Sequence, residues 1–104
     1  MESRSQGGEG HAGAPRLRLL LLITGLGQGG AEKALFTLAT GLDRARFDVR
    51  VACLLAPGPY AERLEQAGIP VHALDMSGKS DASAFFRLRA LLREQRIDVL
   101  HSFL

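Results

Sequence analysis

The sequence predicts an α/β fold with a Rossmann-like parallel sheet, a partial domain with four strands in the order 3-2-1-4 and three helices. Apolar runs of strand length alternate with segments of helical periodicity along residues 16–104. Each pair of consecutive strands is separated by a stretch of helical length, which makes the strands parallel and the crossovers right-handed. A glycine-rich corner follows the first strand, where open α/β sheets bind ligands.

The composition limits the chain to one small domain. It has 104 residues, of which 46% are hydrophobic and 23% are charged, the balance of a soluble globular protein. A net charge of +2 is too small to indicate a nucleic-acid partner. One cysteine and three scattered histidines offer neither a disulfide framework nor metal-ligand spacing, so we expect no metal site. A single cysteine also fits a reducing compartment, and we expect a cytoplasmic protein.

Residues 1–15 differ in composition from the rest of the chain. They contain four glycines, scattered charges and no Ile, Leu, Val or Phe. Such a segment buries too little apolar surface to offset the entropy that ordering it would cost. We therefore expect a disordered leader over residues 1–15 and the folded part over residues 16–104.

The first strand is predicted over residues 17–24. This run is apolar almost throughout, as expected for a strand that is covered on both faces. A secretory signal peptide also begins with basic residues such as Arg16 and Arg18, but its apolar region extends over roughly 7–15 residues and ends in small residues. Here the run stops at Thr24 and enters the glycine corner, which favours the buried strand.

The next elements are a helix, a strand and a second helix. Apolar residues recur at helical spacing over 31–42, and they alternate with other residues over 47–55, which is strand spacing. Pro59 is suited to open a helix, and Gly68 is suited to stop it. We therefore predict the second helix between these two residues.

A short third strand, a third helix and a fourth strand complete the predicted sheet. They cover residues 70–74, 84–95 and 97–104 in turn. In the order 3-2-1-4 the first strand lies beside the fourth, where the winding direction reverses and where ligands bind in a crevice beyond the carboxyl ends of the strands. The loop after the fourth strand would complete this crevice, and the chain ends before it. We therefore expect a fragment of a longer protein.

The corner between the first strand and the first helix spans residues 25–33, GLGQGGAEK. Four of its first six residues are glycine, which permits positive φ and lets a ligand approach the backbone. No Ser, Thr, Asp or Asn caps the helix, so the N–H groups of its first turn are available to a phosphate or another anion. The alternative is a tight turn that serves packing alone, which rarely needs four glycines.

Two phosphate-binding motifs fit this corner incompletely. A P-loop requires Gly-Lys followed by Ser or Thr, and Gly30 is followed by Ala-Glu. The dinucleotide fingerprint is formally met by Gly25, Gly27 and Gly30, but it needs an acidic residue about 20 residues later, and residues 52–56 contain none. A Rossmann-type dinucleotide-binding oxidoreductase stays open as an alternative.

Over residues 17–104 the chain resembles the GT-B glycosyltransferases of family 4. The likeness rests on a series of stretches that follow in the family's order and with similar spacing. These are TGLGQGGAEK at 24–33, RVACLL at 50–55, PGP at 57–59, AGIPV at 67–71 and IDVLHSFL at 97–104.

The resemblance implies an enzyme that transfers a sugar from a nucleotide-sugar donor to an acceptor without a metal or other cofactor. Its N-terminal domain mainly receives the acceptor, and a second, C-terminal Rossmann-like domain holds the donor. The glycine loop approaches the donor's phosphates and sugar across the cleft between them. The resemblance also implies that Glu32 accepts a sugar or acceptor hydroxyl, with a helix-dipole partner as the alternative. The implied substrate-binding residues are Gly25, Gly27, Gly29, Gly30, Ala31 and Glu32.

The chain also departs from the family pattern. Many members carry a histidine just after the fourth strand that faces the reacting sugar, some as His-x-His, whereas His101 is followed by Ser102 and Phe103. We therefore assign no catalytic residue. The second domain's paired-glutamate pattern and its phosphate-binding Arg/Lys pair are missing, so we expect the 104-residue chain alone to be inactive. An inactive fragment that acts as an interaction module is a further alternative.

The predicted third helix is basic on its outer side, with Arg87, Arg89, Arg93 and Arg96. A solvated face is the ordinary interpretation of such a pattern. Attraction to anionic lipid is the second interpretation, because several members of the resembled family act on membrane acceptors. The expected partners are therefore a nucleotide-sugar donor, an acceptor of unknown structure, the missing C-terminal domain and, through this helix, a membrane surface.

Overall fold

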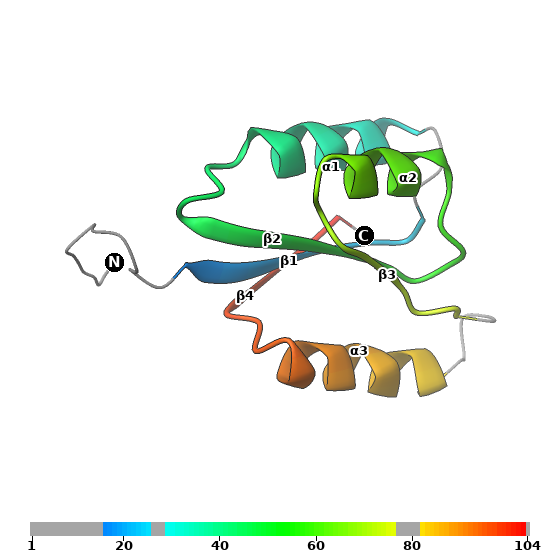
Figure 1. Cartoon of the computed structure of the whole chain (residues 1–104). Coiled ribbons are helices and arrows are strands. Elements are labelled where there is room, and N and C mark those ends of the chain that lie inside the picture. Colours follow the sequence, from blue (N-terminus) through cyan, green and yellow to red (C-terminus); the bar gives the residue numbers. More distant parts are fainter. Residues whose placement is uncertain (1–15, 26–28, 77–81, 104) are drawn as a thin grey trace.

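The computed structural model describes residues 16–25, 29–76 and 82–103. The leader predicted over 1–15 lies outside this part. The elements are, in chain order, β1 (Leu17–Ile23), α1 (Gly30–Gly41), β2 (Phe47–Cys53), α2 (Pro59–Gln66), β3 (Val71–Ala73), α3 (Ala82–Glu94) and β4 (Val99–Ser102). The strands form one parallel sheet in the order β3-β2-β1-β4 (Figure 1), which confirms the predicted fold class.

β1 occupies the interior of the sheet and pairs on both sides. It runs in register with β2 from Leu17 opposite Phe47 to Ile23 opposite Cys53. Its other side pairs with β4, where Leu21 lies opposite His101. α1 and α2 cover one face of the sheet and α3 covers the other (Figure 1). This double cover explains why β1 is apolar at successive positions rather than at alternate ones.

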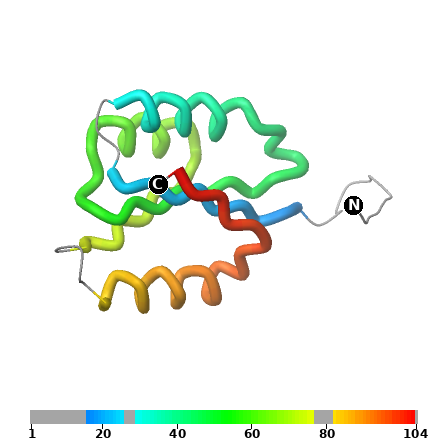
Figure 2. The backbone as a smooth tube through the Cα atoms, turned by 180° about the vertical axis from the view of Figure 1, so that it is seen from behind, coloured from blue at the N-terminus to red at the C-terminus, as the bar shows by residue number. Residues whose placement is uncertain are grey.

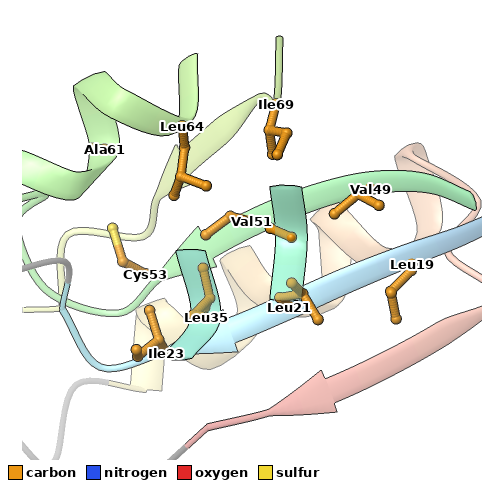
Figure 3. Close-up of a cluster of buried hydrophobic side chains, with 11 residues drawn as sticks. Leu19, Leu21, Ile23, Leu35, Val49, Val51, Cys53, Ala61, Leu64 and Ile69 are labelled. Carbon is orange, nitrogen blue, oxygen red and sulfur yellow. The ribbon is translucent and has the colours of Figure 1, made fainter. Parts of the chain in front are cut away.

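The larger core cluster lies between the sheet and the helices α1 and α2. Leu35 and Leu64 are fully buried here and point from their helices toward the strands (Figure 3). They meet the side chains that β1 and β2 direct to this face at every second residue. The buried members are Leu19, Leu21, Ile23, Leu35, Ala39, Val49, Val51, Cys53, Ala61, Leu64 and Ile69.

A smaller cluster lies on the opposite face, beneath α3. Leu20 and Leu22 of β1 and Ala52 of β2 supply the strand side of it, and Leu91 supplies the helix side. The strand side chains are those that alternate with the members of the larger cluster. The strand spacing predicted over 47–55 is therefore confirmed, because successive β2 residues reach opposite clusters.

α2 begins at the predicted residue, Pro59, and its last helical residue is Gln66, two residues before the predicted stop at Gly68. Pro59 occupies the first helical position, where its missing N–H costs no helical hydrogen bond. Gly68 adopts a φ of +86°, the left-handed conformation that ends many helices. The chain then turns toward β3 through a hydrogen bond from the Ile69 N–H to the Leu64 carbonyl oxygen at 2.9 Å.

The two edges of the sheet differ. β3 is three residues long and follows Pro70, so it presents a short edge. All four residues of β4 are exposed, including Val99 and Leu100. Figure 2 shows β4 on the near side of the molecule, between the levels of α1 and α3. Within the described part of the chain, β4 pairs with β1 on one side and leaves its other side open.

Candidate functional site

The carboxyl ends of three strands meet where the glycine corner begins. The Leu54 N–H donates to the Ile23 carbonyl oxygen at 3.0 Å, and the Leu55 N–H donates to that of Thr24 at 2.8 Å. On the other side of β1, the Phe103 N–H donates to the Leu22 carbonyl oxygen at 2.7 Å. These bonds place Thr24 between the ends of β2 and β4, at the reversal of winding where the crevice was predicted.

α1 begins without a side-chain cap. Gly29, its N-cap residue, is extended with φ −83° and ψ 177°. The Lys33 N–H donates to the Gly29 carbonyl oxygen at 3.2 Å as the first bond of the helix, so the N–H groups of Gly30, Ala31 and Glu32 have no helical acceptor. Gly29, Gly30 and Ala31 are exposed. The predicted absence of a capping side chain is confirmed, and this helix start faces open space.

Glu32 turns back over the start of the helix. A methyl group placed on Gly29 would lie 2.7 Å from Glu32 Oε1 and 3.3 Å from its Cδ, so the missing side chain at position 29 leaves room for the carboxylate. Glu32 is the acidic residue of the first turn and is half-buried. Its negative charge near the helix N-terminus complements the helix dipole. This geometry agrees with the dipole interpretation of Glu32 and also keeps its oxygens at the edge of the corner.

Neither packing nor backbone conformation demands glycine at Gly25 and Gly30. A Cβ built at either position would meet no atom within 4 Å. Among the described glycines the positive φ belongs to Gly68, so the expectation that glycine serves positive φ in this corner is wrong for residues 25, 29 and 30. Gly27 lies outside the described residues. At Gly25 and Gly30 the structure therefore shows open space beside the Cα atom and no packing reason for glycine.

The end of β4 lies beside the end of β1, on the side away from β2. The rings of His101 and Phe103 lie 4.9 Å apart at an interplanar angle of 60°. Both residues direct their side chains to the face that α1 and α2 cover, since His101 pairs with Leu21, and Phe103 packs against the larger core cluster. His101 is exposed and lies on the strand rather than in the loop beyond it, so the structure gives no reason to assign it a catalytic role.

An arginine of α3 fixes the loop that follows β3, and the sequence pattern did not indicate this. Arg87 Nε donates to the Leu74 carbonyl oxygen at 2.6 Å, and Nη2 donates to that of Asp75 at 3.1 Å. Asp75 takes a φ of 53°, and the next N–H, that of Met76, donates to the Leu54 carbonyl oxygen at 2.7 Å. The interpretation of Arg87 as part of a purely solvated face is therefore wrong.

None of the groups with shifted pKa values among the described residues belongs to the corner itself, although Cys53 lies opposite Ile23 at the end of β1. Burial raises the pKa of the Cys53 thiol, which is fully buried in the larger core cluster. Burial, reinforced by the Arg50 guanidinium, lowers the pKa of His72 in β3. A hydrogen bond from Arg50 lowers the pKa of Asp48. What the described corner offers chemically is a set of backbone N–H donors and the carboxylate of Glu32.

Two kinds of feature are absent from the described residues. They contain no group of three or more His, Cys, Asp or Glu side chains placed to hold a metal ion. None of their helices is both long and apolar enough to cross a membrane. The site described above is thus built from backbone, glycine and one acidic side chain.

Comparison with known proteins identifies the family. A family model described as a glycosyl transferase 4-like domain matches residues 29–104, from the N-cap residue of α1 through β4. No curated protein and no solved structure matches the chain. The matched region includes Gly29, Gly30, Ala31 and Glu32, which make the uncapped helix start. The chain belongs to the glycosyltransferase 4-like domain family, as the motifs of its sequence indicated.

Proposed function

We propose that this domain is the acceptor-side half of a GT-B glycosyltransferase, which transfers a sugar from a nucleotide-sugar donor to an acceptor. The observation that carries the proposal is the start of α1, which is uncapped and exposed and follows the end of β1, beside which β4 also ends. Membership of the glycosyltransferase 4-like family supports sugar transfer as the class of reaction. The Rossmann-type oxidoreductase is disfavoured, because Leu54 and Leu55 stand where an acidic residue would hold a ribose.

The backbone of the corner would act on the diphosphate of the donor. The N–H groups of Gly30, Ala31 and Glu32 lack helical acceptors, and the positive end of the α1 dipole lies among them. Such donors bind phosphate, and they stabilise the charge that develops on a leaving diphosphate as the bond to the sugar breaks. The open space at Gly25 and Gly30 lets those oxygens approach the main chain.

Glu32 would change partner when the donor binds. A diphosphate at the start of α1 meets the Glu32 carboxylate, which lies beside Gly29 in the structure. Two negative groups at one helix end repel each other, so the carboxylate is expected to turn outward. In that position Glu32 accepts a hydroxyl of the sugar or of the acceptor. The helix-dipole role and the substrate role thus belong to two states of the same side chain.

A complete active site would need a second Rossmann-like domain that holds the nucleotide. The domain described here would then bind a nucleotide-sugar weakly, with a Kd on the order of 1 mM, and would not transfer sugar alone. Binding rather than turnover is therefore the measurement that suits the 104-residue chain.

The proposal is tested by titrating the ¹⁵N-labelled chain with UDP-glucose, GDP-mannose and NADH. We expect one of the nucleotide-sugars to shift the amides of Gly29, Gly30 and Ala31, with NADH shifting them less. Gly30→Val should abolish these shifts, because the side chain occupies the approach to the helix N-terminus. Gly41→Val is the matched control, since Gly41 ends the same helix and also has open space at its Cβ.

Three outcomes would count against the proposal. Shifts confined to other parts of the sheet would place the ligand away from the glycine corner. Equal effects of the two glycine variants would mean that a change in α1 as a whole explains the loss. A clear preference for NADH would favour the oxidoreductase instead.

A further inference from the structure

His72 of β3 faces α3 and has no part in the proposed sugar transfer. It lies opposite Ala52 of β2, a member of the smaller cluster beneath α3. Paired residues of neighbouring strands point to the same face of a sheet, so the imidazole is directed toward α3. Its Nε2 atom is buried and has no hydrogen-bond partner among the described residues. A titratable ring thus lies beneath the helix with one polar atom unsatisfied.

A hydrogen-bonded network on the same face joins β2 to the end of α3. Arg50 precedes Ala52 by two residues, so both side chains point to the face that α3 covers. Its Nε and Nη2 atoms donate to the two carboxylate oxygens of Asp48 at 3.3 and 2.8 Å. Its Nη1 atom donates to Oε1 of Gln95, the residue that follows the last residue of α3. One guanidinium therefore connects the strand to the carboxyl end of this helix.

The charged groups around His72 favour the neutral form of its ring. Asp48 is the carboxylate that lies on this face of β2, and it is already bonded to Arg50. Glu94 of α3 and Asp75 after β3 are exposed, and the α3 side chains that pack on the smaller cluster are apolar. Cations therefore outnumber carboxylates on the described part of this face. They are Arg18 of β1, which lies opposite Asp48, Arg50 of β2 and Arg87 of α3.

We propose that protonation of His72 in mild acid releases α3 from the sheet as a unit. An imidazolium donates from both ring nitrogens, and the buried Nε2 has no acceptor while α3 is in place. Its charge also repels the Arg50 guanidinium, which holds the end of α3 through Gln95. Both costs disappear when α3 moves away and water reaches the ring. Burial, reinforced by the Arg50 charge, lowers the pKa of His72 while α3 is in place, so opening takes up a proton as the pH falls below 6.5.

α3 is the helix whose release leaves the larger core cluster intact. It packs on the smaller cluster, whereas α1 and α2 share the larger one. Elements with few buried apolar contacts open before the whole domain unfolds. Release would also free the loop after β3, because Arg87 of α3 donates to the carbonyl oxygens of Leu74 and Asp75. The inference goes beyond sugar transfer, since it concerns a change of conformation that needs neither donor nor acceptor.

The test is amide hydrogen exchange of the ¹⁵N-labelled 104-residue chain at about pH 7.5 and about pH 5.5, on either side of the ordinary pKa of histidine. Protection factors, which correct for the intrinsic effect of pH on exchange, are compared for Leu91 and Leu92 of α3 and for Leu38 and Ala39 of α1. We expect the α3 amides to lose about tenfold in protection at the lower pH and the α1 amides to lose less than about twofold.

Three variants identify the groups responsible. His72→Gln should make the α3 protection factors the same at both pH values, because the glutamine does not titrate. His101→Gln is the matched control, since His101 is exposed on β4, and it should keep the tenfold loss. Gln95→Ala removes the acceptor of Arg50 Nη1 and should lower α3 protection about threefold already at the higher pH. Far-UV circular dichroism checks that every variant is folded.

The proposal is overturned if the α1 and α3 amides lose protection equally, because the acid would then unfold the whole domain. It is also overturned if the folded His72→Gln variant keeps the loss in α3, or if His101→Gln removes it. Unchanged α3 protection in Gln95→Ala would mean that Arg50 does not hold the helix, which contradicts the proposed route of release.

Discussion

The Phe103 N–H donates to the Leu22 carbonyl oxygen at 2.7 Å, and this bond fastens the end of β4 to the end of β1. The Phe103 ring packs on the larger core cluster, so the same residue ties the strand end to the interior. The end of β4 is thus held by both backbone and side chain. The helix start on the other side, by contrast, has three N–H groups without a helical acceptor. The proposed site for an anionic ligand rests on these unsatisfied donors.

Glu32→Gln should separate the two roles of this carboxylate. Loss of its charge near the helix N-terminus should lower the free energy of unfolding by about 0.5 kcal/mol. Binding of UDP should strengthen, since a negative neighbour is removed, whereas a nucleotide-sugar should gain less because its hydroxyl loses an acceptor. Isothermal titration calorimetry with both ligands measures the difference. Glu62→Gln, in the first turn of α2, should lower stability similarly and leave both affinities unchanged.

Gly68→Ala should destabilise the domain by about 1–2 kcal/mol, because an alanine Cβ is strained in the left-handed conformation. Gly68 adopts this conformation with a φ of +86°. Urea denaturation followed by circular dichroism gives the change in unfolding free energy. Gly41→Ala, at the end of α1, should stay within about 0.5 kcal/mol of the unchanged chain or increase its stability. Equal losses at the two positions would mean that the conformation at Gly68 is not what requires glycine there.

Arg87→Gln should loosen the loop after β3. The guanidinium bonds to the Leu74 and Asp75 carbonyl oxygens at 2.6 and 3.1 Å, and their loss should cost about 1–2 kcal/mol. Hydrogen exchange at Met76 should accelerate, because its N–H bond to Leu54 depends on the loop position. Arg89→Gln, two residues along the same helix, should change stability by less than about 0.5 kcal/mol. An unchanged exchange rate at Met76 would show that Arg87 does not hold the loop.

His72 should make the domain less stable in mild acid. Burial lowers its pKa in the folded state below the value of 6.5, so the unfolded chain binds the proton more readily. The stability from the neutral imidazole is therefore fully present above pH 6.5 and is lost as the pH falls through the lowered pKa. His72→Gln should flatten this part of the curve of unfolding free energy against pH. A variant that loses stability as steeply as the unchanged chain would contradict the assignment.

Asp48 contributes in a separate, more acidic range. The hydrogen bond from Arg50 Nη2 to Asp48 Oδ2, 2.8 Å long, lowers the pKa of this carboxyl below 3.8 in the folded state. Its stabilising effect is present above pH 3.8 and is lost as the pH falls through the lowered pKa. It should therefore appear in both the unchanged chain and the His72→Gln variant, and the difference between their curves isolates the histidine.

The fold was predictable because its signals are local. Apolar positions alternate in β2, Pro59 is the first residue of α2, and Gly68 follows the end of that helix in the left-handed conformation. Each of these signals can be recognised from the residue types of a short segment. The helical connections predicted parallel strands and right-handed crossovers, and the order of the strands was that of a Rossmann-like half-sheet. The position of a ligand crevice was predicted from this order alone.

Other features of the site depend on contacts that no local pattern records. Arg87 reaches carbonyl oxygens 13 and 12 residues earlier in the chain, which periodicity cannot reveal. The Glu32 carboxylate lies beside Gly29 because of the rotamer that its side chain adopts. The residue type alone does not determine that rotamer. Of the two properties for which glycine was expected in this corner, positive φ is not used at Gly25, Gly29 or Gly30. Open space beside the backbone is present at Gly25 and Gly30.

The burial of Cys53 allows opening of the sheet to be measured as the rate of a chemical reaction. Cys53 is the sole thiol of the chain, it lies fully buried at the end of β2, and burial raises its pKa. The Cys53 thiolate can attack a disulfide reagent and release its thiolate product only after the sheet opens around β2, between β1 and β3. The rate of reaction with Ellman's reagent would therefore report how often the sheet opens around Cys53, in the unlabelled and unmutated protein.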